Sequence, residues 1–204
     1  MRLPSRSTAA RLAASAMRMS IALVLGVGVA TLNVSVVINA VVALAVTYLP
    51  ALLRRDWDLR LSPGLTLVIT TAVLLHSLGM VGLYEGLWWY DHLTHTLSAG
   101  IVAAVGYATT RAIDQHSDAV SFPPRFLSVF LLLMTLALGV FWEVLEFVAR
   151  LAAGAAGIDA VLVQYGLEDT ILDLVFDTLG ALLVALFGTR RLSGLVAVIS
   201  ARLA

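Results

Sequence analysis

Residues 64–83 read GLTLVITTAVLLHSLGMVGL, a run of 20 residues without aspartate, glutamate, lysine or arginine. An α-helix rises 1.5 Å per residue, so this run gives a helix about 30 Å long, close to the hydrocarbon thickness of a bilayer. The stretch therefore predicts a membrane-spanning helix, and the rest of the chain is interpreted outward from it.

Similar apolar runs lie on both sides of this stretch. Those that follow it predict spans at about 91–111, 126–150 and 169–189. Before it, 35 residues between Arg18 and Arg54 carry no charge. That length suits two spans, at about 17–33 and 35–53, with a turn near Thr31-Leu32-Asn33. The sequence thus predicts an all-α fold, a polytopic transmembrane helical bundle of about six spans that forms a single domain over residues 1–204.

Composition supports a multi-pass protein of the cell membrane. Of the 204 residues, 60% are hydrophobic and only 13% are charged, which is more apolar than a soluble domain of this length requires. The absence of cysteine excludes disulfides and thiol nucleophiles. The net charge is zero, so nothing points to a nucleic-acid partner, and the oligomeric state is left open.

The distribution of arginine predicts the orientation of the bundle. With six spans and a cytoplasmic N-terminus, Arg150 alone among the 13 basic residues lies outside, and Arg2 and Arg190 lie with the others inside. This asymmetry follows the positive-inside rule and predicts that both termini are cytoplasmic. Aromatic residues between Tyr84 and Tyr90 then mark the outer interface.

Acidic and histidine side chains interrupt three of these spans at the end predicted to face outward. The candidate metal ligands are Asp91, His95, Glu143, Glu146, Asp173 and Asp177. Asp91 and His95 are four residues apart, as are Asp173 and Asp177, so each pair shares one helical face. Carboxylates in hydrocarbon cost roughly 2.5–3.5 kcal/mol each, so this group predicts a bound cation, shared protons or a water-filled vestibule. Oxygen-rich ligands with imidazole favour Mg²⁺, Mn²⁺, Fe²⁺ or Ca²⁺.

Several of these residues also admit simpler interpretations. Asp91 and Asp169 can cap the first turns of their helices. Glu146 can pair with the arginine one turn later. His92 is expected at the interface, and His76 is expected to be a hydrogen-bonded core histidine.

The chain resembles the YjdF-like family of uncharacterised prokaryotic membrane proteins over about residues 84–190. The resemblance rests on Tyr90-Asp91…His95, Phe141-Trp142-Glu143…Glu146, and Gly166…Asp169-Thr170…Asp173 followed by Gly180-Ala181-Leu182. It is also similar, more distantly, to VanZ-like proteins, whose pattern has asparagine where this chain has Asp177. Neither resemblance implies a reaction.

Three functions remain open from the sequence. The first is a metal-dependent enzyme that acts on a lipid or lipid-linked substrate, with Glu143 and Asp173 as catalytic residues. The second is a proton- or cation-coupled transporter, although the inner half of the bundle holds few polar residues, Asn39 among them. The third is a non-enzymatic structural membrane protein with a bound ion.

Overall fold

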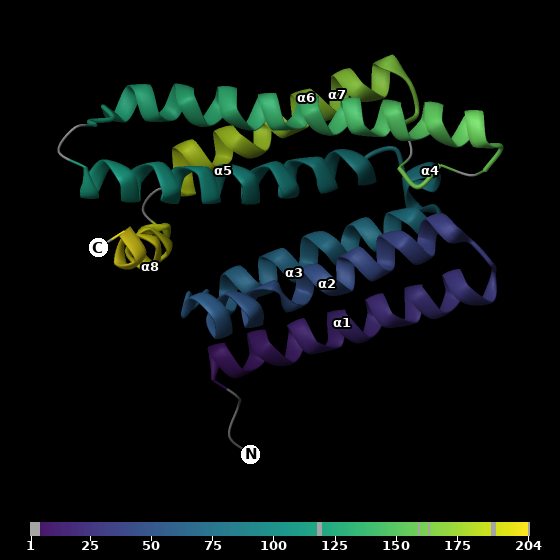
Figure 1. Cartoon of the computed structure of the whole chain (residues 1–204), viewed down its shortest axis with the longest axis horizontal. Helices are drawn as coiled ribbons and strands as arrows, with labels where there is room; N and C mark the ends of the chain where they lie inside the picture. The colour runs from purple at the N-terminus through teal and green to yellow at the C-terminus, as the bar shows by residue number, and fades with distance from the viewer. Residues whose placement is uncertain (1–4, 118–119, 159, 163, 189–190, 204) are drawn as a thin grey trace. The chain divides into compact units, whose positions relative to one another are not determined.

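The computed structural model describes residues 5–117, 120–158, 160–162, 164–188 and 191–203, and all regular elements within these ranges are helices (Figure 1). The helices are α1 (Arg6–Ala30), α2 (Val34–Trp57), α3 (Pro63–Leu78), α4 (Tyr84–Gly86), α5 (Tyr90–His116), α6 (Pro124–Ala156), α7 (Leu167–Leu183) and α8 (Ser193–Leu203), with π-helical turns at Gly79–Leu83 and Val184–Gly188. The predicted all-α fold is confirmed. Arg2 and Arg190, used in the orientation prediction, lie outside the described residues.

Within the described residues, five helical segments are long and apolar enough to cross a membrane. They are Ser7–Ala30, Val34–Trp57, Pro63–Gly86, Pro124–Ala156 and Leu167–Gly188. Helix α5 fills the predicted span 91–111 and is 27 residues long, but it is not among the five. Its first turns carry Asp91, His92, Thr94 and His95, which make it the most polar of the long helices. The multi-pass architecture is therefore confirmed, whereas six crossings and cytoplasmic termini stay predictions.

The chain divides into two compact units, which are described separately. The first contains Met1–Asp91 and Glu146–Val163, and the second contains His92–Leu145 and Gln164–Ala204. The prediction of a single domain stays a prediction.

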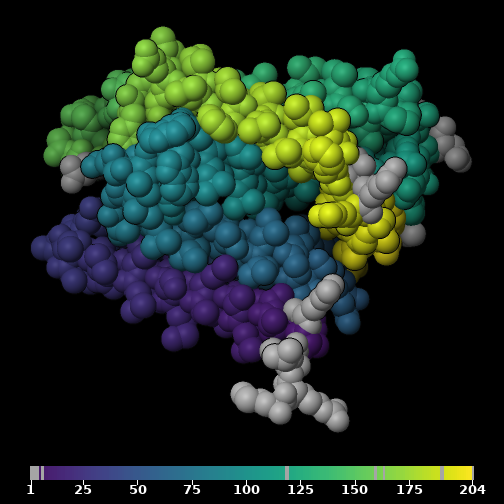
Figure 2. All heavy atoms as spheres, turned by 180° about the vertical axis from the view of Figure 1, so that it is seen from behind, coloured from purple at the N-terminus to yellow at the C-terminus, as the bar shows by residue number. Residues whose placement is uncertain are grey.

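In the first unit, α1 and α2 form an antiparallel hairpin at the predicted turn. Leu32 adopts a left-handed conformation with φ 56°, and the Asn33 side chain accepts a 3.0 Å hydrogen bond from the amide of Val36, which caps α2. Side chains of α1 and α2 form a buried apolar cluster that residues of α3 cover, and the two helices lie against each other in Figure 2 (purple to blue). The cluster consists of Ile21, Val24, Val36, Ala40 and Ala43.

A π-helical turn ends α3. Gly82 has φ 116°, a conformation that favours glycine, and the ring of Tyr84 folds back against Gly79 so closely that a Cβ atom at Gly79 would overlap it. The turn thereby directs the Tyr84 side chain toward α3.

In the second unit, α6 buries every fourth residue. Its buried stripe comprises Leu127, Leu131, Thr135, Gly139 and Glu143. Gly106 of α5 lies 3.6 Å, measured from an ideal Cβ, from a methyl group of Leu131, and Gly139 lies against Asp177 of α7. The stripe is therefore the surface through which α6 contacts its neighbours.

The predicted spans at about 126–150 and 169–189 correspond to the helical segments Pro124–Ala156 and Leu167–Gly188. Helix α6 continues beyond the predicted span to Ala156. Residues 151–156 read LAAGAA, in which alanine and leucine are strong helix formers, so the helix continues past Arg150. The last turn of the second segment, Val184–Gly188, is π-helical.

Candidate cation site

His95 of α5 lies between two carboxylates of α7. Its Nδ1 is 3.1 Å from Oδ1 of Asp177, and its Nε2 is 3.8 Å from Oδ1 of Asp173. Asp173 is 1% exposed and Asp177 is 5% exposed, so both carboxylates are removed from solvent. They meet one imidazole because they are four residues apart on one face of α7. The predicted proximity of His95 to Asp173 and Asp177 is thus what the structure shows.

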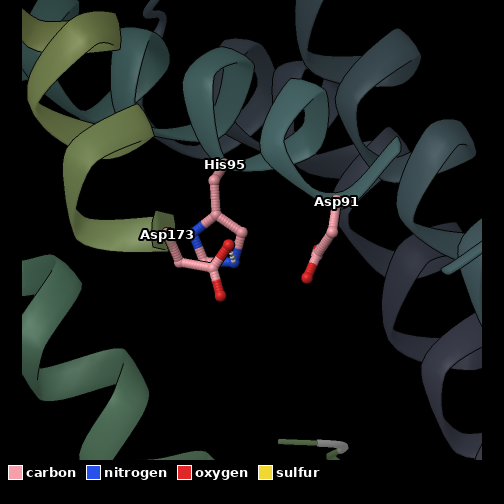
Figure 3. Close-up of side chains that lie close together, drawn as sticks. All are labelled: Asp91, His95 and Asp173. Carbon is pink, nitrogen blue, oxygen red and sulfur yellow. Dashed lines mark ion pairs between the residues drawn. The ribbon is translucent and has the colours of Figure 1, made fainter. Parts of the chain in front are cut away.

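Asp91 precedes His95 by one turn of α5. Ligand atoms of Asp91, His95 and Asp173 all lie within 4.8 Å of one another (Figure 3). Two oxygen or nitrogen ligands of an ion with bonds of about 2.1 Å are at most about 4.2 Å apart, and with Ca²⁺-type bonds of about 2.4 Å they reach about 4.8 Å. Three ligands cannot all lie opposite one another, so the three side chains would have to move somewhat closer together to bind one ion.

His92 was expected to point toward the membrane interface. Its side chain instead is buried within the protein, at 8% exposure. Its ring stacks on Phe176 with ring centroids 4.5 Å apart, and its Nδ1 is 3.6 Å from Oδ1 of Asp173. The spacing of three residues from His95 places both histidines on the face of α5 that meets α7. This spacing is the feature of the sequence from which a place for His92 near the site could have been predicted.

Glu143 approaches the same part of the second unit from α6. It is 5% exposed, and its Oε2 accepts a 2.7 Å hydrogen bond from the hydroxyl of Thr170, which in turn accepts one of 3.0 Å from Nε2 of Gln164. Its other oxygen, Oε1, is buried and has no hydrogen-bond partner among the described residues. Thr170 thus fixes one oxygen of the Glu143 carboxylate, and the other oxygen remains available to accept a hydrogen bond.

The remaining acidic candidates have different surroundings. Glu146 is buried one turn beyond Glu143, whereas Arg150 is exposed with its guanidinium 5.3 Å from the centre of the Phe147 ring. Arg150 forms no ion pair within the part of the chain that the structure describes, so the alternative in which it pairs with Glu146 is not observed. Asp169 is not the N-cap of α7, which is Gly166, but lies in the first turn and accepts a 3.2 Å hydrogen bond from the backbone amide of Tyr165 before the helix.

His76 belongs to a separate hydrogen-bond network in the first unit. Its Nε2 is 3.0 Å from Oδ1 of Asn39, and its Nδ1 is 2.8 Å from the hydroxyl of Tyr84, which confirms a hydrogen-bonded core histidine. Asn39 also donates a 2.8 Å bond to the carbonyl of Val161. Asn39 was expected in the inner half of the bundle, but it bonds the same histidine as Tyr84, which lies at the end predicted to face outward.

Two glycines that the sequence did not single out allow the helices of the site to approach. A Cβ atom at Gly139 would meet Oδ2 of Asp177, and one at Gly180 would meet the carbonyl oxygen of Thr96 and lie 3.0 Å from the amide of Gly100. The Thr96 hydroxyl also donates to the carbonyl of Phe176 over 3.3 Å. These contacts set the distance from α7 to α5 and α6, and hence the distances within the site.

The chain belongs to the family described as predicted membrane protein (DUF2238), whose model matches residues 12–194. An uncharacterised protein of Thermotoga maritima is 30% identical over 134 residues, which are 63% of this chain and 63% of that protein. The chain thus spans somewhat less than two thirds of that relative. No solved structure matches the chain.

Proposed function

We propose that this protein binds a divalent cation through Asp91, His95 and Asp173. The observation that carries the proposal is the approach of an imidazole nitrogen and two carboxylates to within 4.8 Å of one another, with Asp173 almost fully buried. Gathering such groups in hydrocarbon is unfavourable unless a positive charge compensates them.

The arginines of the described residues do not supply that charge. Their ion pairs join Arg55 to Asp56, Arg60 to Asp58 and Arg111 to Asp114, all away from these ligands. The nearest basic groups are His92 and His95, which face Asp173 and Asp177, and Asp91 adds a third carboxylate to the group. A divalent ion balances the charge better than any side chain of the described residues.

The donor set is mixed, with carboxylate oxygen and imidazole nitrogen. This combination suits Mn²⁺ and Fe²⁺ and is compatible with Mg²⁺ or Ca²⁺. A bound ion of this kind would polarise a phosphoryl or carbonyl oxygen. Glu143 is suited to act as a general base, because Thr170 fixes one of its oxygens and leaves the other available to accept a proton. We therefore favour a metal-dependent enzyme that acts on a membrane lipid or lipid-linked substrate, with Asp173 serving as a ligand.

The first test is binding of Mn²⁺ to the purified protein in detergent, measured by electron paramagnetic resonance of the free ion. The wild type should bind Mn²⁺, and Asp173→Asn should lose binding because it removes ligand charge at nearly constant shape. Asp56→Asn is the matched control, since Asp56 is exposed and pairs with Arg55. No binding by the wild type, or equal binding by Asp173→Asn, would refute the cation site.

A second pair of assays separates the enzyme from a transporter. Turnover of membrane lipids by the reconstituted protein, lost in Glu143→Gln, supports the enzyme. Mn²⁺ or proton flux into liposomes without lipid turnover supports a cation-coupled transporter instead. Binding with neither activity supports the structural role. The resemblance to VanZ-like proteins stays a prediction, and the interpretation of these assays does not depend on it.

A further inference from the structure

We propose that Asp177 is a positioning residue that holds the proton of His95 on Nδ1 and so presents Nε2 to the cation. This inference rests on the proposed cation site, and it assigns Asp177 a role different from that of the ligands with which the sequence grouped it. Three observations support it: the distances from His95 to the two carboxylates, the hydrogen-bonding capacity of each group, and the packing around Asp177.

The distances distinguish the two carboxylates of α7. Asp177 is 3.1 Å from Nδ1 of His95, which is a hydrogen-bond distance, whereas Asp173 is 3.8 Å from Nε2, which is not. An ionised carboxylate only accepts hydrogen bonds, so the bond to Asp177 requires a proton on Nδ1. In the neutral ring Nε2 then carries a lone pair. This lone pair and Oδ1 of Asp173 repel each other. A cation between the two atoms would bind both of them and remove the repulsion.

The same relation is common at metal sites. A histidine that binds a metal through one nitrogen usually donates the other N–H to a carboxylate, which fixes the tautomer and the orientation of the ring. His95 has this arrangement, with Asp177 as the acceptor on the side opposite Asp173 (Figure 3 shows the Asp173 side).

Gly139 provides the space that this arrangement needs. A Cβ atom there would overlap Oδ2 of Asp177 and lie 3.3 Å from its Cγ. Any larger residue would move the carboxylate away from His95 or force α6 and α7 apart. Gly139→Ala is therefore a variant that disturbs Asp177 without changing a polar group.

His76 serves as an internal reference with the opposite tautomer. Both amide protons of Asn39 are donated to carbonyls, of Ser35 and Val161, so its Oδ1 must accept from Nε2–H of His76. Nδ1 of His76 then accepts from Tyr84. The hydrogen bonds thus place the protons of the two histidines on different nitrogens.

The experiment is nuclear magnetic resonance of the full chain in detergent with ¹⁵N-labelled histidine. The chain has four histidines, and His95→Gln and His76→Gln assign the two signals. We expect a proton on Nδ1 of His95 and on Nε2 of His76. In Asp177→Asn the His95 proton should no longer be held on Nδ1, because the amide can accept or donate, while the His76 signal stays unchanged. A wild-type His95 whose only proton is on Nε2 would overturn the inference.

Mn²⁺ affinity supplies the second readout. Loss of such a hydrogen-bond partner typically weakens metal binding about 10- to 100-fold. Asp177→Asn and Gly139→Ala should weaken binding within that range yet still saturate, whereas Asp173→Asn should not bind. Equal affinity of Asp177→Asn and wild type overturns the inference, and so does complete loss, since Asp177 would then be a ligand. Failure of the wild type to bind Mn²⁺ overturns the proposed function, and the tautomer of His95 then still tests whether Asp177 orients the ring.

Discussion

Gly180 of α7 packs its backbone against the carbonyl oxygen of Thr96 on α5, in the space that a Cβ atom would occupy. The contact lies one turn beyond both His92 and Asp177. Interhelical approach of this kind is typical of membrane helices, where small residues allow backbones to pack closely.

Replacement of Gly180 by alanine should destabilise the protein by about 1–3 kcal/mol, because overpacking forces the two helices apart. Gly100→Ala is the control, since its Cβ would lie 3.8 Å from the nearest atom, an ordinary contact. Alanine has the higher helix propensity by about 1 kcal/mol, so Gly100→Ala should be neutral or stabilising. Thermal unfolding in detergent measures both, and equal midpoints for the two variants would contradict the close contact.

Thr170→Val should destabilise the protein by about 1–3 kcal/mol, because it leaves Oε2 of Glu143 buried without its 2.7 Å hydrogen bond. Thr170→Ser keeps the hydroxyl and should retain most of the stability. Glu143→Gln combined with Thr170→Val should cost less than the sum of the two changes, which a double-mutant cycle of unfolding free energies would detect. Additive costs would indicate that the two side chains act independently.

Tyr84→Phe should destabilise the first unit by about 1 kcal/mol, because Nδ1 of His76 loses its 2.8 Å donor. Gly79→Ala should cost more, since the added methyl group overlaps the Tyr84 ring and disturbs the π-helical turn. Gly86→Ala is the control, as no atom lies within 4 Å of a Cβ there. Unfolding midpoints in detergent that rank Gly86→Ala below Gly79→Ala would refute the role of the turn.

The predicted orientation can be tested by labelling, and the chain contains no native cysteine that would interfere. A cysteine at Ser62 should be unreactive toward an impermeant thiol reagent in intact cells, while one at Gly86 should react. Both residues are exposed and lie at opposite ends of the segment Pro63–Gly86. The reverse pattern would place the cation site at the cytoplasmic side.

The membrane helices could be predicted because the length and apolar character of a span are fixed by the bilayer. The turn at Leu32 could also be predicted, since 35 uncharged residues exceed one span. Charged groups in apolar helices are conspicuous for the same reason, so Asp173 and Asp177 stood out before any contact was known. The length of α6 beyond a bilayer span was not predicted, because the bilayer thickness does not determine where a helix of strong helix formers ends, here at Ala156.

The finer features of the site were not available from composition or periodicity. Thr170 resembles many hydroxyl residues that bond within membrane helices, and nothing in the sequence joins it to Glu143 across 27 residues. Gly139 lies in an apolar run where a glycine is ordinary. Its importance depends on which carboxylate lies opposite, and that is decided by how the helices pack.

The four-residue spacing of the buried stripe on α6 decides which neighbouring helix each part of the stripe meets. Each step of four residues turns about 400°, so the stripe from Leu127 to Glu143 winds about 160° around the helix axis. Its apolar part meets α5 at Gly106, and its polar part meets α7 at Asp177 and Thr170. Deleting one residue between Leu131 and Gly139 would rotate Glu143 by about 100° away from Thr170 and leave the contact with Gly106 in place. The number of residues in this segment therefore fixes which neighbour each part of the stripe meets, so natural variation there should neither insert nor remove residues.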